Sequence, residues 1–303
     1  MLAVTGAGGF IGRYIIPKLG METRCLVRRV EDSLHPHSDV LGDLQNVDDI
    51  KKLVKHADIL LHLACSSIPR TSDRDLVTDV QSNLLSSISL FQEYAKINRE
   101  GHIIYFSTGG AMYNITEPRP PVKESEPPVP WSGYGIHKLA AEHYLRLICR
   151  THNIRGTIFR IANPYGTFLP PTRKQGLIGT AFTCASSNQT LDIFDSLETV
   201  RDYIHLDDIV RLLALTIERP SPRGKVDLYH VGTGIGTSIR QVLSSIESIT
   251  GLKIRIHILS RPDQRATYNV LDCSLVQHRL GWTAAIGIKE GLSSMWASQR
   301  PLH

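Results

Sequence analysis

Cysteine is scarce in this sequence and follows no pattern. The 303 residues contain five cysteines, an odd number at wide spacing: Cys25, Cys65, Cys149, Cys184 and Cys273. They form no C-x-x-C pair and no cysteine–histidine cluster at metal-ligand spacing, which argues against a disulfide framework and against a structural zinc site. We therefore expect reduced thiols in a cytoplasmic protein that binds no metal.

Long apolar runs and concentrated charge are missing as well. No apolar run reaches the ~18 residues that span a bilayer. Because the first apolar run begins at Leu2, we expect no signal peptide. The net charge of +5 is spread along the chain, with Arg28–Arg29 and Lys51–Lys52 among the few adjacent basic pairs. We therefore expect neither a membrane nor a nucleic acid as a partner, whereas a small anionic substrate would account for the charge.

The first twelve residues, MLAVTGAGGFIG, carry the strongest local signal. An apolar run at 2–5 leads into Gly6, Gly9 and Gly12, and an apolar stripe with helical spacing follows. A strand that enters a helix through glycines can bind a pyrophosphate, because glycines permit a tight turn and the helix N-terminus offers free N–H groups. The alternative is a turn without a ligand, but the strand and the helix that a dinucleotide site requires are both present.

Predicted strands and helices alternate over the first half of the chain. Apolar runs predict strands at 2–5, 23–27, 40–42, 58–64, 102–107 and 157–161, and helical periodicity predicts helices at 47–55, 75–98 and 134–152. This alternation is typical of α/β proteins with a doubly wound parallel sheet. After Asn163 the elements are shorter, which indicates a smaller α/β lobe. We expect a dinucleotide-binding domain of residues 1–163 plus 205–232 and a substrate-binding lobe of residues 164–204 plus 233–303.

A second signal is Tyr134-x-x-x-Lys138 in the predicted helix 134–152. Spacing of four residues puts both side chains on one face of a helix. A tyrosine with its ordinary pKa of about 10 is a poor base at neutral pH. A neighbouring ammonium group and a positively charged nicotinamide favour the phenolate, which can remove a proton from a hydroxyl group while hydride leaves the adjacent carbon. The same spacing often occurs by chance, so its weight comes from its place after the dinucleotide-binding half.

Further motifs follow one another in the order of a known family. They are TGAGGFIG, Gly42-Asp43-Leu44, Asp58-x-x-x-His62-Leu63-Ala64, Asn83, Tyr134-x-x-x-Lys138, Arg160-x-x-Asn163-x-x-Gly166, Val200-Arg201-Asp202-Tyr203-Ile204-His205 and Arg261-Pro262-Asp263. With these motifs the chain resembles the NAD-dependent epimerase/dehydratase family of extended short-chain dehydrogenases/reductases, which includes the UDP-galactose 4-epimerases.

The resemblance implies a Rossmann-type fold and a role for each matching residue. Tyr134 and Lys138 would be catalytic. The residues that would hold the cofactor are Gly6, Gly9, Phe10, Ile11, Gly12, Asp43, Leu44, Leu63, Ala64 and Asn83, together with the catalytic pair. The residues that would bind a nucleotide sugar are Asn163, Arg201 and Arg261, which hold its diphosphate, and Leu177.

The chain departs from the family pattern near the catalytic tyrosine. Family epimerases have a serine or threonine where this chain has Gly109. We expect Thr108 or Ser107 to supply the hydroxyl that orients the substrate, the alternative being that both residues only end the strand. In another loop, Cys65-Ser66-Ser67 replaces a lysine or similar polar residue, so any contact from that loop is neutral and shorter.

A further departure concerns the cofactor. NAD-preferring members have an aspartate at the end of the second strand, where this chain has Val27-Arg28-Arg29. Without a carboxylate for the ribose, Arg28 is expected to bind a 2′-phosphate. We therefore expect NAD or NADP and favour NADP, the alternative being that the arginines are a solvated pair.

These observations predict a nucleotide-sugar 4-epimerase, acting on a UDP-hexose through a 4-keto intermediate with a nicotinamide cofactor. One alternative is an NAD(P)H-dependent nucleotide-sugar 4-ketoreductase, and a more distant one is a non-catalytic, NADP-binding redox sensor. The helices predicted at 75–98 and 134–152 carry more apolar residues than one sheet face needs. Because the matching helices pair across a two-fold axis in the family, we expect a homodimer.

Overall fold

The computed structural model describes residues 1–35, 37–168, 176–259 and 266–299, and the chain divides into two compact units. Unit 1 comprises Met1–Tyr113, Pro127–Ile161 and Leu213–Tyr229, and unit 2 comprises Asn114–Glu126, Ala162–Leu212 and the chain from His230 onward. The proline-rich segment Asn114–Glu126 thus belongs to unit 2. The cause is backbone hydrogen bonding, since Val122 N–H donates to the Val270 carbonyl and Thr267 N–H donates to the Ile115 carbonyl.

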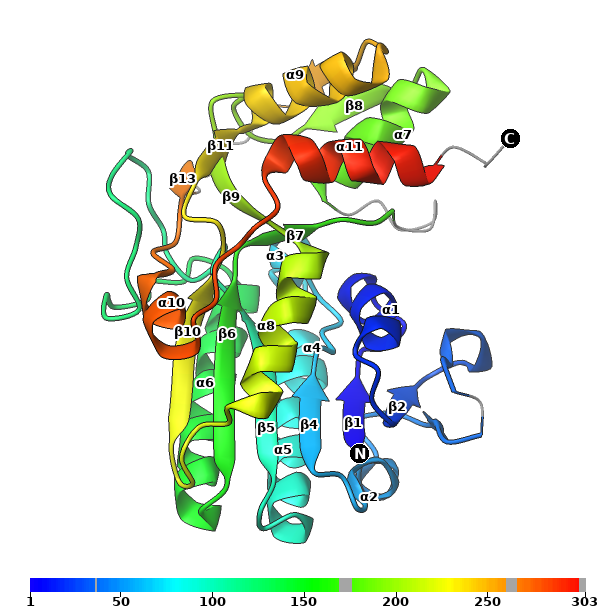
Figure 1. The fold of residues 1–303 in the computed structure, drawn as a ribbon, viewed down its shortest axis with the longest axis vertical. Helices are drawn as coiled ribbons and strands as arrows, with labels where there is room; N and C mark the ends of the chain where they lie inside the picture. The colour runs from blue at the N-terminus through cyan, green and yellow to red at the C-terminus, as the bar shows by residue number, and fades with distance from the viewer. Residues whose placement is uncertain (36, 169–175, 260–265, 300–303) are drawn as a thin grey trace. The chain divides into compact units, whose positions relative to one another are not determined.

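Unit 1 is built on a seven-stranded sheet with the order β10-β6-β5-β4-β1-β2-β3 (Figure 1). Its strands are β1 Leu2–Thr5, β2 Thr23–Val27, β3 Val40–Leu41, β4 Ile59–His62, β5 His102–Thr108, β6 Arg155–Ile161 and β10 Val226–Val231. The strand pairs from β3 to β6 are all parallel. β1, β4 and β5 are buried along their whole length, as strands covered on both faces must be. The predicted doubly wound parallel sheet is confirmed.

The strand order reverses between β1 and β4. The chain runs from β1 outward through β2 and β3, then returns to the other side of β1 for β4, β5 and β6. In open α/β sheets, ligands bind outside the carboxyl ends of the strands at such a reversal. The register pairs Thr5 with His62 and His62 with Tyr105, so the loops after β1 and β4 leave the sheet at the same edge.

Helices cover both faces of this sheet. They are α1 Phe10–Ile15, α2 Val47–Val54, α3 Pro69–Ser72, α4 Leu76–Asp79, α5 Ser86–Ile97, α6 Gly133–His152 and α8 Leu206–Glu218, with shorter turns η1 Ile16–Lys18 and η2 Val30–Asp32. Figure 1 shows the second half of α8 in front of the sheet and α5 and α6 behind it. On the α5 and α6 face the core includes Leu53 of α2, Phe91 of α5 and Leu145 of α6, all fully buried.

The helix predicted at 75–98 is not continuous. The structure has α4, then a π-helical segment η3, Val80–Leu85, and then α5. The Asn83 amide donates to the Asp79 carbonyl oxygen at 3.1 Å, and the Ser86 hydroxyl donates to the Gln81 carbonyl oxygen at 3.2 Å. Side chains that bond to nearby carbonyls compete with the α-helical ladder. The periodicity predicts helical structure here, but it does not distinguish an α-helix from a π-helical turn. Such turns often mark a functional site.

Unit 2 has a small mixed sheet around β9 Val200–His205. β9 pairs with β7 Asn163–Tyr165 and β13 Tyr268–Asn269 in parallel and with β11 Gly236–Ser238 antiparallel, while β8 Thr190–Ile193 pairs with β12 Arg255–Ile258. Its helices are α7 Leu177–Ser187, α9 Ile239–Thr250, α10 Ser274–Leu280 and α11 Ile288–Gln299. Buried Phe182, Val242 and Leu292 belong to one core. No helix among the residues described is long and apolar enough to cross a membrane.

Candidate active site

The glycine loop follows β1 closely. Gly6 has a φ of +79°, and a Cβ there would lie 2.6 Å from the backbone nitrogen of Ala64. A Cβ on Gly12 would lie 2.4 Å from the Gly6 carbonyl oxygen, which fixes how α1 packs on the loop. Gly9 is the N-cap of α1, and no side chain caps the helix there. The loop therefore combines close backbone packing with a helix N-terminus whose N–H groups no side-chain cap satisfies.

The His62 side chain, at the end of β4, supports the loop that follows this strand. The His62 Nδ1 lies 2.6 Å from the Thr5 hydroxyl, and its Nε2 lies 2.9 Å from the Ser87 hydroxyl. Burial lowers the pKa of His62 to about 3, so the ring is neutral. Leu63 N–H donates to the Thr5 carbonyl oxygen, so the start of this loop is tied to the end of β1. Leu63 and Ala64, both predicted cofactor residues, are half-buried.

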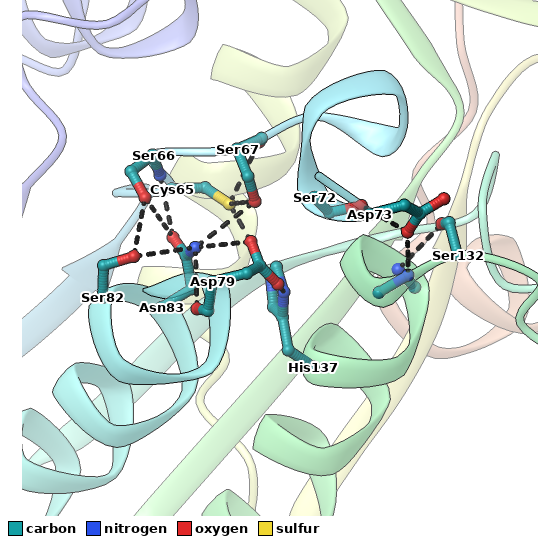
Figure 2. Close-up of polar contacts among 12 residues, drawn as sticks. Cys65, Ser66, Ser67, Ser72, Asp73, Asp79, Ser82, Asn83, Ser132 and His137 are labelled. Atoms are coloured by element: carbon teal, nitrogen blue, oxygen red, sulfur yellow. Dashed lines mark hydrogen bonds and ion pairs between the residues drawn. The ribbon is translucent and has the colours of Figure 1, made fainter. Parts of the chain in front are cut away.

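Asn83 holds the continuation of the same loop. Its side-chain oxygen accepts from the Ser66 N–H at 2.8 Å, and its amide donates to the Ser67 hydroxyl at 3.3 Å (Figure 2). Asn83 is buried within η3. In this structure Asn83 is therefore a residue that positions the loop beside Ala64.

Arg28 and Arg29 follow β2, and Arg29 lies near Arg13 of α1 and Asp32 of η2. Arg28 is exposed, and among the residues described no ion pair involves it. Arg29 pairs with Asp32 at 3.0 Å, and Arg13 pairs with Asp32 at 2.5 Å. A Cβ on Gly8 would lie 2.9 Å from the Asp32 carboxylate. The expectation that no carboxylate is available here is therefore wrong, because η2 brings Asp32 back against the glycine loop.

Asp43 and Leu44 follow β3. The Asp43 N–H donates to Asp49 at 3.2 Å, and the Asp43 carboxylate is exposed and accepts from the Gln45 N–H at 2.9 Å. Leu44 packs against the core of unit 1. The Gly42 N–H donates to the Val27 carbonyl oxygen, which places this turn beside the end of β2.

Tyr134 and Lys138 begin α6 near the carboxyl end of β5. The helix is capped by Ser132, whose hydroxyl accepts from the Gly135 N–H. The Lys138 ammonium donates to the Phe106 carbonyl oxygen at 2.8 Å and lies 5.9 Å from the centre of the Tyr134 ring. Burial raises the pKa of Tyr134 and lowers the pKa of Lys138. A buried tyrosine of this kind needs a positive charge nearby to become a base.

The two candidate hydroxyls have different partners. Thr108 forms a hydrogen bond with Tyr134, which opposes the rise in the tyrosine pKa caused by burial. The Ser107 hydroxyl donates to Glu142 at 2.5 Å. Glu142 also forms a buried, two-bond ion pair with Arg160. Thr108 is thus the hydroxyl that the structure brings to Tyr134, and Ser107 is part of the support below it.

Sequence reasoning missed the role of Glu142. It lies four residues after Lys138 and eight after Tyr134, on the same stripe of α6. A carboxylate at this spacing on a buried helix face was the available signal. Asp32 gave no comparable signal, because its approach to Gly8 depends on the course of a turn rather than on spacing.

The residues predicted to bind substrate lie in unit 2. The Asn163 amide on β7 donates to the Asp202 carbonyl oxygen at 2.9 Å. The Arg201 guanidinium on β9 donates to the carbonyl oxygens of Val200 and Ala266, and burial lowers its pKa. Leu177 begins α7 and packs on the unit 2 core. Arg261 lies outside the described residues.

Comparison with known proteins decides the family. The model described as "NAD dependent epimerase/dehydratase family" matches residues 2–232. This chain belongs to that family. A dTDP-4-dehydro-6-deoxyglucose reductase of Escherichia coli is 27% identical, over 98% of this chain and 96% of the relative. A putative UDP-glucose 4-epimerase of Methanocaldococcus jannaschii is 29% identical, over 96% of each.

Two solved structures share the fold over almost the whole chain. UDP-glucose 4-epimerase of Thermotoga maritima, solved with UDP-glucose, has a TM-score of 0.88 and 26% identity and covers 97% of this chain and 96% of its own. MoeE5, in complex with UDP-glucuronic acid and NAD, has a TM-score of 0.87 and 25% identity and covers 98% and 99%. The chain is therefore an enzyme of the NAD dependent epimerase/dehydratase family.

The family's cofactor fits this glycine loop. Close backbone packing leaves no room for a side chain at Gly6 or Gly12, and the N-terminus of α1 carries no side-chain cap. Both features suit a pyrophosphate that approaches backbone N–H groups.

Proposed function

We propose that the protein is a nucleotide-sugar 4-epimerase that acts on a UDP-hexose through a 4-keto intermediate. The observation that carries the proposal is the group of Tyr134, Thr108 and Lys138 at the end of β5, in the same sheet edge as the glycine loop. The relatives named UDP-glucose 4-epimerase support the substrate class.

In this proposal Tyr134 takes the proton of the sugar 4-hydroxyl and later returns it. Thr108 holds the same oxygen through its hydroxyl, and Lys138 favours the phenolate by its charge. The hydrogen bond to the Phe106 carbonyl keeps the ammonium group in place. A bound nicotinamide would supply the reversible two-electron oxidation at C4. The remaining site residues would hold the substrate while the keto sugar rotates to present its other face.

We assign cofactor binding to unit 1 and diphosphate binding to unit 2. Gly6, Gly9, Phe10, Ile11, Gly12, Leu63 and Ala64 would line the dinucleotide, with Asp43 and Leu44 at the adenine. Asn163, Arg201 and Arg261 would hold the diphosphate, with Leu177 among the substrate contacts. Arg201 supports this assignment, since a guanidinium whose pKa burial lowers is stabilised by an anion.

A 4-ketoreductase is the second candidate, and the Escherichia coli reductase relative favours it. A reductase exchanges its cofactor at every turnover, whereas an epimerase regenerates its own. The absorbance of the purified protein after denaturation separates the two. A near-stoichiometric nicotinamide released from the protein supports the epimerase, and a protein free of nicotinamide supports the reductase.

For the cofactor, we propose that NADP binds more tightly than NAD. Asp32 would disfavour a phosphate, but its charge is balanced by Arg13 and Arg29. Arg28 is exposed, next in the chain to Arg29, and can bind a 2′-phosphate. The neighbouring structure MoeE5 contains NAD, so the proposed preference for NADP rests on Arg28 alone.

We also propose a homodimer through α4, η3, α5 and α6. These elements contact one another and carry large exposed apolar side chains. The set is Leu76, Val77, Val80, Leu85, Ile97, Ile136, Tyr144 and Leu147. On α6 the exposed positions follow a single helical stripe, and contiguous apolar patches of this kind mark interfaces. In the described part of the chain no disulfide links any of the five cysteines, which suits the proposed cytoplasmic location.

A further inference from the structure

One cysteine lies next to the proposed catalytic pair and takes no part in the mechanism. Cys65 follows Ala64 in the loop after β4 and is exposed. Its Sγ lies 3.7 Å from the Nε2 of His137, which is the residue before Lys138 on α6. Figure 2 shows Cys65 in this loop and His137 on the helix below it.

A buried carboxylate orients the histidine. His137 Nδ1 lies 2.6 Å from Asp79 Oδ2, and both side chains are almost fully buried. The other oxygen, Asp79 Oδ1, accepts from the Asn83 amide at 3.0 Å. A carboxylate can only accept, so Nδ1 carries the hydrogen and Nε2 is directed at the sulfur. Cysteine, histidine and aspartate therefore stand in the order of an activated nucleophile, its base and the group that orients the base.

The charges around the sulfur favour the thiolate. Desolvation by itself would raise the pKa of Cys65, but Lys138 and the hydrogen bond with His137 hold that pKa below its usual value. Three other thiols are different, since burial raises the pKa of Cys25 and of Cys149 to about 12 and raises that of Cys273. The Cys65 sulfur also lies 3.4 Å from the Ser67 carbonyl oxygen and 3.9 Å from the Ser67 hydroxyl, and a thiol that donates to the carbonyl oxygen would retain its proton.

We propose that Cys65 is a redox modification site, at which His137 activates the thiol toward peroxides. His137 takes the thiol proton through Nε2, and the thiolate attacks one oxygen of hydrogen peroxide. An S–O bond forms and the O–O bond breaks, so sulfur is oxidised by two electrons and the peroxide is reduced. The departing hydroxide takes the proton from His137 and leaves as water. The product is a sulfenic acid, which a thiol reductant reverses.

The modification would affect the neighbouring chemistry. The His137 ring lies 5.4 Å from the Tyr134 ring, and Cys65 is close enough to influence the pKa values of Tyr134 and Lys138. Oxidation would remove the thiolate and its interaction with both groups, and would add an oxygen atom in the loop after Ala64. This consequence rests on the proposed function, whereas the reactivity of the thiol does not.

The test is peroxide treatment of the folded, full-length protein with a 1,3-diketone that traps sulfenic acid, followed by mass spectrometry of the modified cysteine. We expect one adduct, at Cys65, and labelling at least roughly tenfold slower in His137→Gln, as for a thiol without its base. Cys273→Ala is the matched control and should label at the wild-type rate. Labelling at another cysteine, or an equal rate in folded His137→Gln, would overturn the proposal.

A measurement without any substitution guards against a variant that fails to fold. Alkylation of wild-type Cys65 by iodoacetamide is compared at pH 7 and pH 9. An ordinary thiol gains roughly twentyfold over this interval, and we expect a gain of threefold or less at Cys65. A full twentyfold gain would show that Ser67 keeps the proton on sulfur and would contradict the proposal. The ionisable groups that interact with the sulfur are Tyr105 of β5 and Tyr134, His137 and Lys138 of α6, and Asp79 of α4 lies on the other side of the His137 ring.

Finally, peroxide should lower turnover of the wild type, and a thiol reductant should restore it. Unchanged turnover with a confirmed Cys65 adduct would count against the proposed catalytic site. It would leave the reactivity of the thiol established.

Discussion

At the scale of single residues, catalysis is assigned to the Tyr134 hydroxyl. Replacing Tyr134 with phenylalanine removes the acid–base group but keeps the ring, so the fold and cofactor binding should persist. We expect turnover to fall by roughly 10²–10⁴-fold, as for a lost acid–base residue. Tyr144→Phe, at an exposed tyrosine of the same helix, is the control and should retain wild-type turnover. A Tyr134→Phe enzyme within a few-fold of wild type would refute the assignment.

Cofactor choice is also decided by one residue. Arg28→Ala should weaken NADP binding by roughly ten- to a hundredfold, because a charge-assisted hydrogen bond contributes about 1.5–3 kcal/mol. NAD binding should change little, and Arg255→Ala, at an exposed arginine of unit 2, should change neither. Titration of both cofactors measures this. Equal affinities of the wild type for NAD and NADP would show that Arg28 is only solvated.

The residue scale also shows the limit of sequence reasoning. Tyr134 and Lys138 could be predicted because helical spacing alone places them on one face. The sequence left Ser107 and Thr108 equivalent, and their partners separate them, since Ser107 donates to Glu142 whereas Thr108 forms a hydrogen bond with Tyr134. Asp32 was missed because a turn, not a periodic element, brings it to Gly8.

At the scale of elements, the strand, glycine loop and helix at the start of the chain together form the proposed pyrophosphate site. Gly12→Ala would put a Cβ 2.4 Å from the Gly6 carbonyl oxygen, so α1 must move away from the loop. We expect loss of cofactor binding and a lower free energy of unfolding. Gly179→Ala is the matched control, a helical glycine whose Cβ would meet nothing within 4 Å. It should raise the stability by up to about 1 kcal/mol, and urea denaturation measures both. Cofactor binding by a folded Gly12→Ala variant would contradict the assignment of the loop.

Elements with long periodic sequence signals were predicted well. β2 begins where expected, and α6 begins one residue earlier than expected, at Gly133. The strands β7, β11 and β13 have two or three residues, too few for an alternating pattern to register. The π-helical turn η3 follows from local bonds of Asn83 and Ser86, which periodicity does not encode.

At the scale of the whole molecule, we predict a dimer. Sedimentation at micromolar concentration should show twice the chain mass of 33.8 kDa. Leu147→Glu, which places a charge on the exposed stripe of α6, should give monomers. Ile235→Glu, at an exposed isoleucine of unit 2, should leave the dimer intact. A wild-type protein that sediments only as a monomer would rule out this interface.

The central claim is that the protein interconverts 4-epimers with a cofactor it regenerates itself. The direct measurement is proton NMR of UDP-galactose incubated with the purified protein, without added reductant. We expect UDP-glucose to appear until the two sugars reach equilibrium, in many turnovers per bound nicotinamide. Two results together would contradict the epimerase and identify a reductase. They are the absence of the 4-epimer with every UDP-hexose offered, and stoichiometric oxidation of added NADPH on a 4-keto nucleotide sugar.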